Sequence, residues 1–166
     1  MEHNSKIDVT TIGNAIVDII AQCDDNFLEE FKIVKSSMDL IDEERSKTLF
    51  DNLKTTTIVS GGSAANTAVG IASFGSKAAF IGKVKNDELG NTFKNDIERV
   101  GVSFKTPLTN EGPRTASSII LVTPDAERSM NTFLGACVNL DENDVDEDQI
   151  RKSKIVYLEG YLFDPP

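Results

Sequence analysis

The sequence predicts an α/β fold in which helices cover a mainly parallel sheet. Apolar, strand-like segments alternate with helix-like segments along the 166 residues, and such alternation is typical of parallel sheets with helices on their faces. No internal repeat or low-complexity linker divides the chain. A glycine pair, Gly61-Gly62, joins an apolar run directly to a helix rich in small residues, as expected where a strand turns sharply into a helix.

Two strands and two helices are predicted before the glycine pair. The strands span Ile7–Ile12 and 16–21, on either side of a turn at Gly13-Asn14. Residues 24–31 are expected to form a short helix opened by acidic side chains. Residues 42–53 carry apolar side chains at helical spacing behind an acidic cap, and are expected to form an amphipathic helix.

Strands and helices continue to alternate after the small-residue helix. Gly101 is expected to end one helix, because glycine is common directly after a helix C-terminus. A turn at Pro124-Asp125 is expected to link two strands into a pair. The helix is predicted at 88–100, and the strands at 78–84, 117–122, 130–134 and 154–158.

Six carboxylates fall within the nine residues 141–149. Acidic side chains stabilise the positive end of a helix dipole and basic ones stabilise the other end. Arg151, Lys152 and Lys154 follow the acidic run. We therefore expect a helix N-terminus here; the alternative is a cation site.

Charge and hydropathy exclude two classes of partner. The net charge is −10, whereas a nucleic-acid surface needs clustered Lys and Arg, and negative charge disfavours binding to anionic membranes. No apolar run approaches the ~20 residues of a membrane span, and the polar N-terminus carries no signal peptide. We therefore expect a cytoplasmic protein that binds small molecules, with no nucleic-acid or membrane partner.

Cysteine and histidine are too few to support several kinds of site. Cys23 and Cys137 lie far apart without metal-binding spacing, so two reduced thiols are expected. His3 is the single histidine and lies in a polar tail. Its position removes Ser-His-Asp and Cys-His mechanisms and most zinc sites from this chain. We expect no metal site.

The start of the small-residue helix is a candidate ligand site. Glycine lets the backbone approach a ligand closely, and the first N–H groups of a helix have no partner within it. Asn66 lies in that first turn, which is a place to hold a hydroxylated or anionic ligand. The alternative is a plain strand–turn–helix capped by Ser63.

Four segments together resemble one protein family. The stretch from Gly61 to Val84 resembles the N-terminal signature of the ribokinase-like (PfkB) carbohydrate kinases, and Ile12-Gly13-Asn14-Ala15-Ile16-Val17-Asp18 resembles the family's first strand pair. The stretches from Val122 to Met130 and from Tyr157 to Leu162 resemble its adenosine-kinase-like branch. The segments follow the family's order and cover Ile7 to Pro166. Lys85 departs from the pattern: the family usually has glycine there, which brings the usual positive φ of that turn into question.

The resemblance implies a ribokinase-like fold with a small β lid. Its lid strands are expected within roughly 7–60 and 102–135. Family members are about twice as long, and their catalytic half contains a Gly-Ala-Gly-Asp segment with the catalytic base, which this chain lacks. We therefore interpret residues 1–166 as the N-terminal half of a kinase domain, produced by truncation or a shortened reading frame. The final Asp164-Pro165-Pro166, typical of a helix start, agrees with this interpretation.

An acceptor site is also implied. The family aspartate that binds substrate hydroxyls corresponds to Asp18, which is a carboxylate within an apolar strand. A buried carboxylate is costly unless it has partners, and ligand hydroxyls would supply them; the alternative is a solvent-facing strand position. Asn66 and the Gly61-Gly62 backbone would add donors and acceptors.

Five more residues complete this expected site. Three apolar positions would form a wall for a base, and an arginine would reach the phosphate or close the lid. The alternatives are core packing for the apolar residues and an ion pair with Asp125 or Glu127 for the arginine. The residues are Ile16, Leu40 or Met38, Leu134, and Arg128.

Two functions remain from different classes. The first is an ATP-dependent phosphotransferase that phosphorylates a hydroxymethyl group of a nucleoside or sugar, with adenosine favoured and a fructokinase- or ribokinase-type activity as the alternative. ATP and Mg²⁺ are then implied, bound mainly by the missing half together with the catalytic base. The second is a non-catalytic fragment that binds nucleoside weakly or associates with itself, because a parallel sheet cut midway exposes an edge. The chain alone is expected to be inactive.

Overall fold

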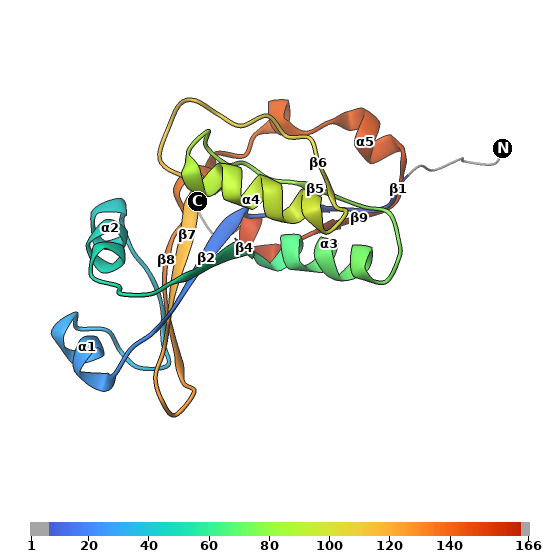
Figure 1. The fold of residues 1–166 in the computed structure, drawn as a ribbon. Helices are drawn as coiled ribbons and strands as arrows, with labels where there is room; N and C mark the ends of the chain where they lie inside the picture. Colours follow the sequence, from blue (N-terminus) through green and yellow to red (C-terminus); the bar gives the residue numbers. More distant parts are fainter. Residues whose placement is uncertain (1–6, 164–166) are drawn as a thin grey trace.

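A computed structural model describes residues 7–163 and contains two β-sheets (Figure 1). The first sheet has four parallel strands in the order β6-β5-β1-β9. Parallel strands need crossover connections, and here helices and a second sheet supply them. The strands are β1 (Ile7–Ile12), β5 (Ala78–Ile81), β6 (Ser103–Phe104) and β9 (Ser153–Leu158).

Helices cover both faces of this parallel sheet. Helices α3 (Ser63–Ser73) and α4 (Glu88–Arg99) pack against one face and enclose an apolar core with Phe80 at its centre. The rings of Phe80, Phe93 and Phe104 lie 5.6–5.9 Å apart, a spacing at which aromatic pairs attract. The short helix α5 (Glu147–Arg151) contacts β1 and β9, and Gln149 of this helix lies near Ile81.

The second sheet has five strands in the order β3-β8-β7-β2-β4. The pairs β2–β7 and β3–β8 are parallel, and β2–β4 and β7–β8 are antiparallel. This sheet extends away from the first one (Figure 1). Its strands are β2 (Ile16–Gln22), β3 (Met38–Leu40), β4 (Thr57–Gly61), β7 (Ala116–Val122) and β8 (Arg128–Phe133).

Helices α1 (Asp25–Glu30) and α2 (Glu43–Asp51) cover one face of the five-stranded sheet, and Figure 1 shows them on the same side. Helix α4 also contacts two strands of this sheet, β2 and β4. Leu49 of α2 is buried among side chains of β2 and β7 such as Ile19 and Leu121. The opposite face has no helix of the described chain packed on it in this way, and several of its apolar side chains are exposed.

Most predicted elements are present, with some differences at their ends. The strands on either side of Gly13-Asn14 do not pair with each other, because β1 belongs to the first sheet and β2 to the second. The strand predicted at 78–84 ends at Ile81. Asp42 caps α2 by accepting a hydrogen bond from Arg45 N, and Gly101 follows α4 with φ 89°. Lys85 is not among the described residues with positive φ; it forms a parallel bridge with Thr109 instead.

The acidic run 141–149 caps two short helical turns. Asp141 and Asp144 form a reciprocal capping box around Glu142–Asp144, and Asp146 caps α5. Lys83 donates hydrogen bonds to Asp144 and Asp141. The bond to Asp144 is the main cause of the raised pKa of Lys83. Within residues 7–163, no group of three His, Cys, Asp or Glu side chains is gathered as a metal site. The caps at Asp141 and Asp146 confirm the predicted helix N-terminus.

Short 3₁₀ segments occupy Gly135–Asn139 and Gly160–Phe163. No helix in the described part of the chain has the length and apolar character to cross a membrane. The expectations for His3 and for Asp164-Pro165-Pro166 lie outside the described residues.

Candidate functional site

Side-chain alternation along β2 places Asp18 on the face of the five-stranded sheet opposite α1 and α2. Val17 and Ile19 are buried, and Ile19 packs against the helices. Successive side chains of a strand point to opposite faces, so Ile16 and Asp18, which are half-buried, lie on the other face. We call this second surface the open face.

A row of polar side chains crosses the open face at Asp18. Strand register sets Asp18 beside Ser118 of β7, and Ser118 beside Thr132 of β8. The two hydroxyl groups are hydrogen-bonded at 2.9 Å. Val59 and Leu40 lie at the two ends of this row, and the side chain of Leu40 is 64% exposed. A carboxylate and two hydroxyls are thus framed by apolar residues, which suits a ligand with both kinds of surface.

The Asp18 carboxylate lies directly against Gly61 on the neighbouring strand. A Cβ atom at Gly61 would be 2.6 Å from Asp18 Oδ1, so no other residue fits there with this carboxylate in place. Desolvation by burial raises the pKa of Asp18 above its usual value. Within residues 7–163, no hydrogen bond to the Asp18 carboxylate offsets this desolvation.

The helix start predicted as a ligand site follows immediately. Gly62 is the N-cap of α3, with φ 95°, and a Cβ there would overlap the carbonyl oxygen of Asn14. The alternative with Ser63 as cap is wrong: Ser63 is the first residue of the helix, and no side chain caps α3. Asn66 lies in the first turn with its side chain exposed. The structure therefore brings Asp18, Gly61 and the first turn of α3 together.

The predicted apolar wall lies on or beside the open face. Ile16 pairs in register with Gly61 and with Ala116. Leu40 stands in the polar row and Met38 is two residues away on the same strand, with 53% of its side chain exposed. Leu134 directly follows β8 and precedes the 3₁₀ segment at Gly135. Core packing, the alternative for these residues, does not describe the exposed Leu40 and Met38.

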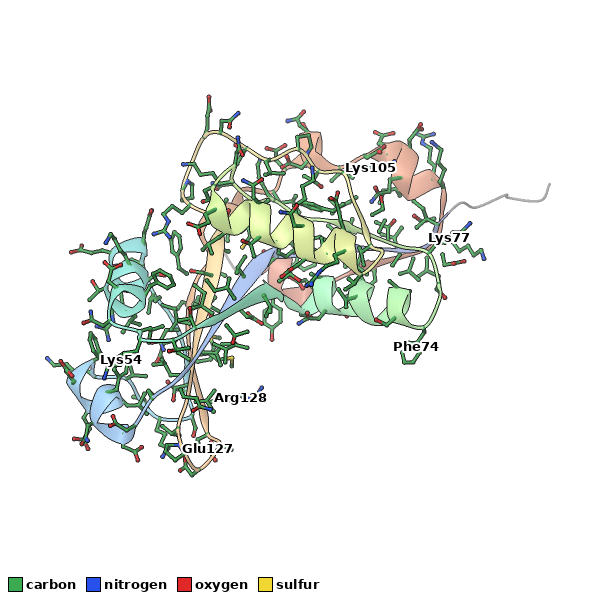
Figure 2. All side chains as sticks on the ribbon, viewed as in Figure 1. Lys54, Phe74, Lys77, Lys105, Glu127 and Arg128 are labelled. Atoms are coloured by element: carbon green, nitrogen blue, oxygen red, sulfur yellow. The ribbon has the colours of Figure 1, made fainter. Side chains whose placement is uncertain are left out.

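Arg128 lies at the other end of the open face. It pairs with Val122 and is four residues from Thr132 along β8, which is about 13 Å at the rise of a strand. Figure 2 places its side chain beside the β7–β8 hairpin, near Glu127. Asp125 pairs with Lys35 at 2.7 Å, Glu127 accepts a hydrogen bond from Ser36 Oγ, and no ion pair joins Arg128 to any described residue. The structure does not bring Arg128 to Asp18.

Glu159 is a buried residue that the sequence prediction did not single out. Its side chain is 2% exposed, and it accepts hydrogen bonds from the backbone N–H groups of Asn14 and Ala64 at 2.6 and 2.8 Å. A signal was present: a lone carboxylate directly follows the apolar strand β9. Ligands of α/β folds bind at the carboxyl ends of parallel strands, so an acidic residue at such a position marks a candidate.

Comparison with known proteins gives a consistent result. Residues 8–166 match the model of the pfkB family of carbohydrate kinases. An adenosine kinase from Sinorhizobium meliloti is 55% identical, with a TM-score of 0.87, over 97% of this chain and 49% of that one. A probable sugar kinase from Rhizobium etli is 50% identical, with a TM-score of 0.88, over 98% of this chain and 49% of that one.

A curated relative is more distant. A probable chloroplastic fructokinase-6 from Arabidopsis thaliana is 36% identical over 99 residues, which are 58% of this chain and 26% of that protein. The chain spans about half the length of the two solved structures. Its parallel sheet flanked by helices is the ribokinase-like fold. The match over residues 8–166 shows that the chain belongs to the pfkB family of carbohydrate kinases.

Proposed function

We propose that this chain is the acceptor-binding half of an ATP-dependent phosphotransferase that phosphorylates a hydroxymethyl group, most favourably that of adenosine. The observation that carries the proposal is the Asp18 carboxylate, which lies desolvated on the open face beside Gly61. A partly buried carboxylate without a donor is unfavourable. Hydroxyl groups of a bound ribose or sugar would supply the donors that it lacks.

The remaining residues have assigned roles in the proposal. Asn66 and the backbone at Gly61-Gly62 bind further hydroxyls of the acceptor. The apolar residues Ile16, Leu40 or Met38, and Leu134 pack against the base. The five-stranded sheet acts as the lid, and Arg128, at the far end of the open face, approaches the phosphate only if the lid moves. Holding the acceptor in one orientation is a large part of what a kinase does, because phosphoryl transfer depends on positioning.

ATP and Mg²⁺ belong to the other half in this proposal. Membership of a kinase family implies use of ATP. Mg²⁺ that binds with a nucleotide is usually held by one or two carboxylates and the substrate phosphates, and the Gly-Ala-Gly-Asp segment that the resemblance places in the catalytic half does not occur in residues 1–166. We therefore assign to this chain only acceptor binding, and propose a cytoplasmic location, which its two free cysteines support.

A sugar is the second candidate acceptor, supported by the fructokinase relative. Adenosine is favoured because the polar row lies next to exposed apolar side chains at Leu40 and Met38, which a purine would cover and a sugar would not. Calorimetric titration of the purified chain with adenosine and with fructose separates the two. Tighter binding of fructose would reverse the order of preference.

Two matched variants test the role of Asp18. Replacing Asp18 with Ala removes a charged hydrogen bond, which costs about 1.5–3 kcal/mol, so adenosine affinity should fall at least tenfold. Asp42→Ala removes a helix cap, should lower stability by about 1 kcal/mol and should leave affinity unchanged. Equal affinities for the two variants would remove Asp18 from the site.

Activity is tested with the chain alone and with the chain fused to the part of a relative that it does not match. The purified 166 residues should show no ATP-dependent phosphorylation of adenosine or sugars, since acid–base and electrostatic groups each contribute about 10²–10⁴-fold. A fusion to the remaining half of the Sinorhizobium meliloti enzyme should phosphorylate adenosine. Turnover by the unfused chain would contradict the assignment of acceptor binding alone to this chain. It would also contradict the alternative that the chain is a non-catalytic fragment.

A further inference from the structure

Three segments that are distant in sequence meet at the side chain of Glu159. The residue follows β9, and its own N–H donates to the carbonyl oxygen of Ile12 at 3.2 Å. Its Oε1 accepts from Asn14 N at 2.6 Å, and its Oε2 accepts from Ala64 N at 2.8 Å. Both carboxylate oxygens are therefore used, each by the backbone of a different segment.

The packing around Glu159 leaves little freedom for these segments to shift. A Cβ atom at Gly13 would be 2.6 Å from both Glu159 Oε2 and Ala64 Cβ, so the carboxylate fills the space above Gly13. Thr11 Oγ1 donates to the carbonyl oxygen of Ala64 at 2.9 Å. The first turn of α3 is thus fixed through its N–H by Glu159 and through its C=O by Thr11.

The two segments that Glu159 joins are the places where the chain passes between the sheets. Asn14 lies between β1 of the first sheet and β2 of the second, and Asp18 is four residues further on. Ala64 lies just after β4 of the second sheet, three residues beyond Gly61, at the start of the helix that covers the first sheet. We call these two connections, which contain Asn14 and Ala64, the crossovers. Asp18 lies shortly after the first crossover and Gly61 shortly before the second, and both crossovers are hydrogen-bonded to the same carboxylate.

We propose that Glu159 is a positioning residue that holds the two crossovers together and thereby sets Asp18 against Gly61 and the start of α3. A carboxylate suits this role because its two oxygens can each accept a hydrogen bond from an N–H donor. Its charge also interacts favourably with the positive end of the α3 dipole. The inference rests on the proposed acceptor site, although the hydrogen bonds themselves do not depend on it.

Glu159→Gln is the informative substitution. It keeps the size of the side chain but replaces one acceptor oxygen with an NH₂ group, which would face an N–H donor. Glu98→Gln is the matched control, because Glu98 is exposed on α4. Amide hydrogen exchange resolved by residue reports on the two crossovers, and adenosine titration reports on the site.

The exchange experiment tests the contacts without reference to function. In the unsubstituted chain, the Asn14 and Ala64 amides should exchange as slowly as amides within α3; rates typical of exposed amides would overturn the proposal even if no variant folds. In Glu159→Gln, at least one of the two should exchange at least tenfold faster, while Ile97 in the α4 core changes only with global stability. No selective change would also overturn the proposal.

A double-variant cycle tests the positioning role. Under conditions where every variant is folded, Glu159→Gln should lower adenosine affinity at least tenfold and Glu98→Gln should not. If Glu159 acts through Asp18, adding Glu159→Gln to Asp18→Ala should weaken binding no more than about twofold further, whereas independent effects would multiply. The positioning role would be overturned if the effects of Glu159→Gln and Asp18→Ala on affinity multiplied, or if Glu159→Gln left adenosine affinity unchanged. Absence of adenosine binding in the unsubstituted chain would instead refute the proposed function, and the exchange result would still decide whether Glu159 holds the two crossovers together.

Discussion

Asp18 occupies the space that a side chain at Gly61 would need. The two residues lie on neighbouring antiparallel strands, two positions apart in register. A Cβ atom at Gly61 would overlap the Asp18 carboxyl group, with Oδ1 at 2.6 Å. The carboxylate and the missing side chain are thus parts of one arrangement. It keeps the carboxylate close to the backbone where β4 turns into α3, which is the place proposed above for an acceptor hydroxyl.

Gly61→Ala is expected to move the Asp18 carboxylate without unfolding the chain. The obstacle is the end of a side chain, which can rotate away, so the main result should be a loss of adenosine affinity. Gly70→Ala is the control in α3, where a Cβ would meet nothing within 4 Å and alanine should stabilise the helix by up to about 1 kcal/mol. Calorimetric titration and urea unfolding of both variants check this. Unchanged affinity in Gly61→Ala would show that the contact is irrelevant to binding.

Asp18→Asn is expected to stabilise the chain at neutral pH while weakening acceptor binding. Burial raises the pKa of Asp18 in the folded state above its usual 3.8, so the folded state holds the proton more tightly than the unfolded state does. The resulting stability is present below the unfolded pKa and is lost as pH rises through the folded pKa. The stability gain of Asp18→Asn over the unsubstituted chain should therefore be larger at about pH 7 than at about pH 3.

Urea unfolding at both pH values measures this difference. Glu98→Gln is again the control, since an exposed surface substitution usually changes stability by less than about 0.5 kcal/mol. A gain that is equal at the two pH values would mean that desolvation does not act on Asp18.

Local patterns in the sequence were sufficient to predict most helices and strands. Asp42 behaves as the cap that its position before an amphipathic helix suggested, and Gly101 ends α4. The pair of strands around Pro124-Asp125 is antiparallel as expected. These features depend on residues close together in sequence, where capping, turn and periodicity signals act.

The arrangement of the site could be predicted only in part. The glycine pair and Asn66 are contiguous, so their closeness follows from the chain. The polar row is different: Ser118 and Thr132 reach Asp18 only through the register of β7 between β2 and β8, and a shift of one residue would place them on the other face. Glu159 is tied to Asn14 across 145 positions of sequence, a pairing that no local pattern reveals.

The two cysteines are expected to react differently with a thiol reagent. Both are free; Cys23 is half-buried and Cys137 is buried. Burial, followed by the negative charge of Glu159, raises the pKa of Cys137 to about 12, and burial also raises that of Cys23. Because the thiolate is the reactive form, Ellman's reagent at about pH 8 should modify Cys23 slowly and Cys137 only after denaturation. Cys23→Ser should abolish the reaction of the folded chain, and rapid modification of Cys137 would contradict its burial.

The 166-residue chain, purified on its own, is expected to form dimers or larger assemblies. Among the described residues β9 pairs with β1 alone, so its other edge is free, and Ile155 and Tyr157 on this strand are 59% and 40% exposed. Unpaired strand edges bind other strands, and burying each large apolar side chain contributes about 1.5–3 kcal/mol. Light scattering at tens of micromolar should give a mass above 18.1 kDa. Ile155→Lys should shift the chain toward monomer if β9 is the contact, whereas Leu40→Lys should do so if the open face is. A stable monomer of the unsubstituted chain would contradict the expectation, and would mean that the edge of β9 is protected.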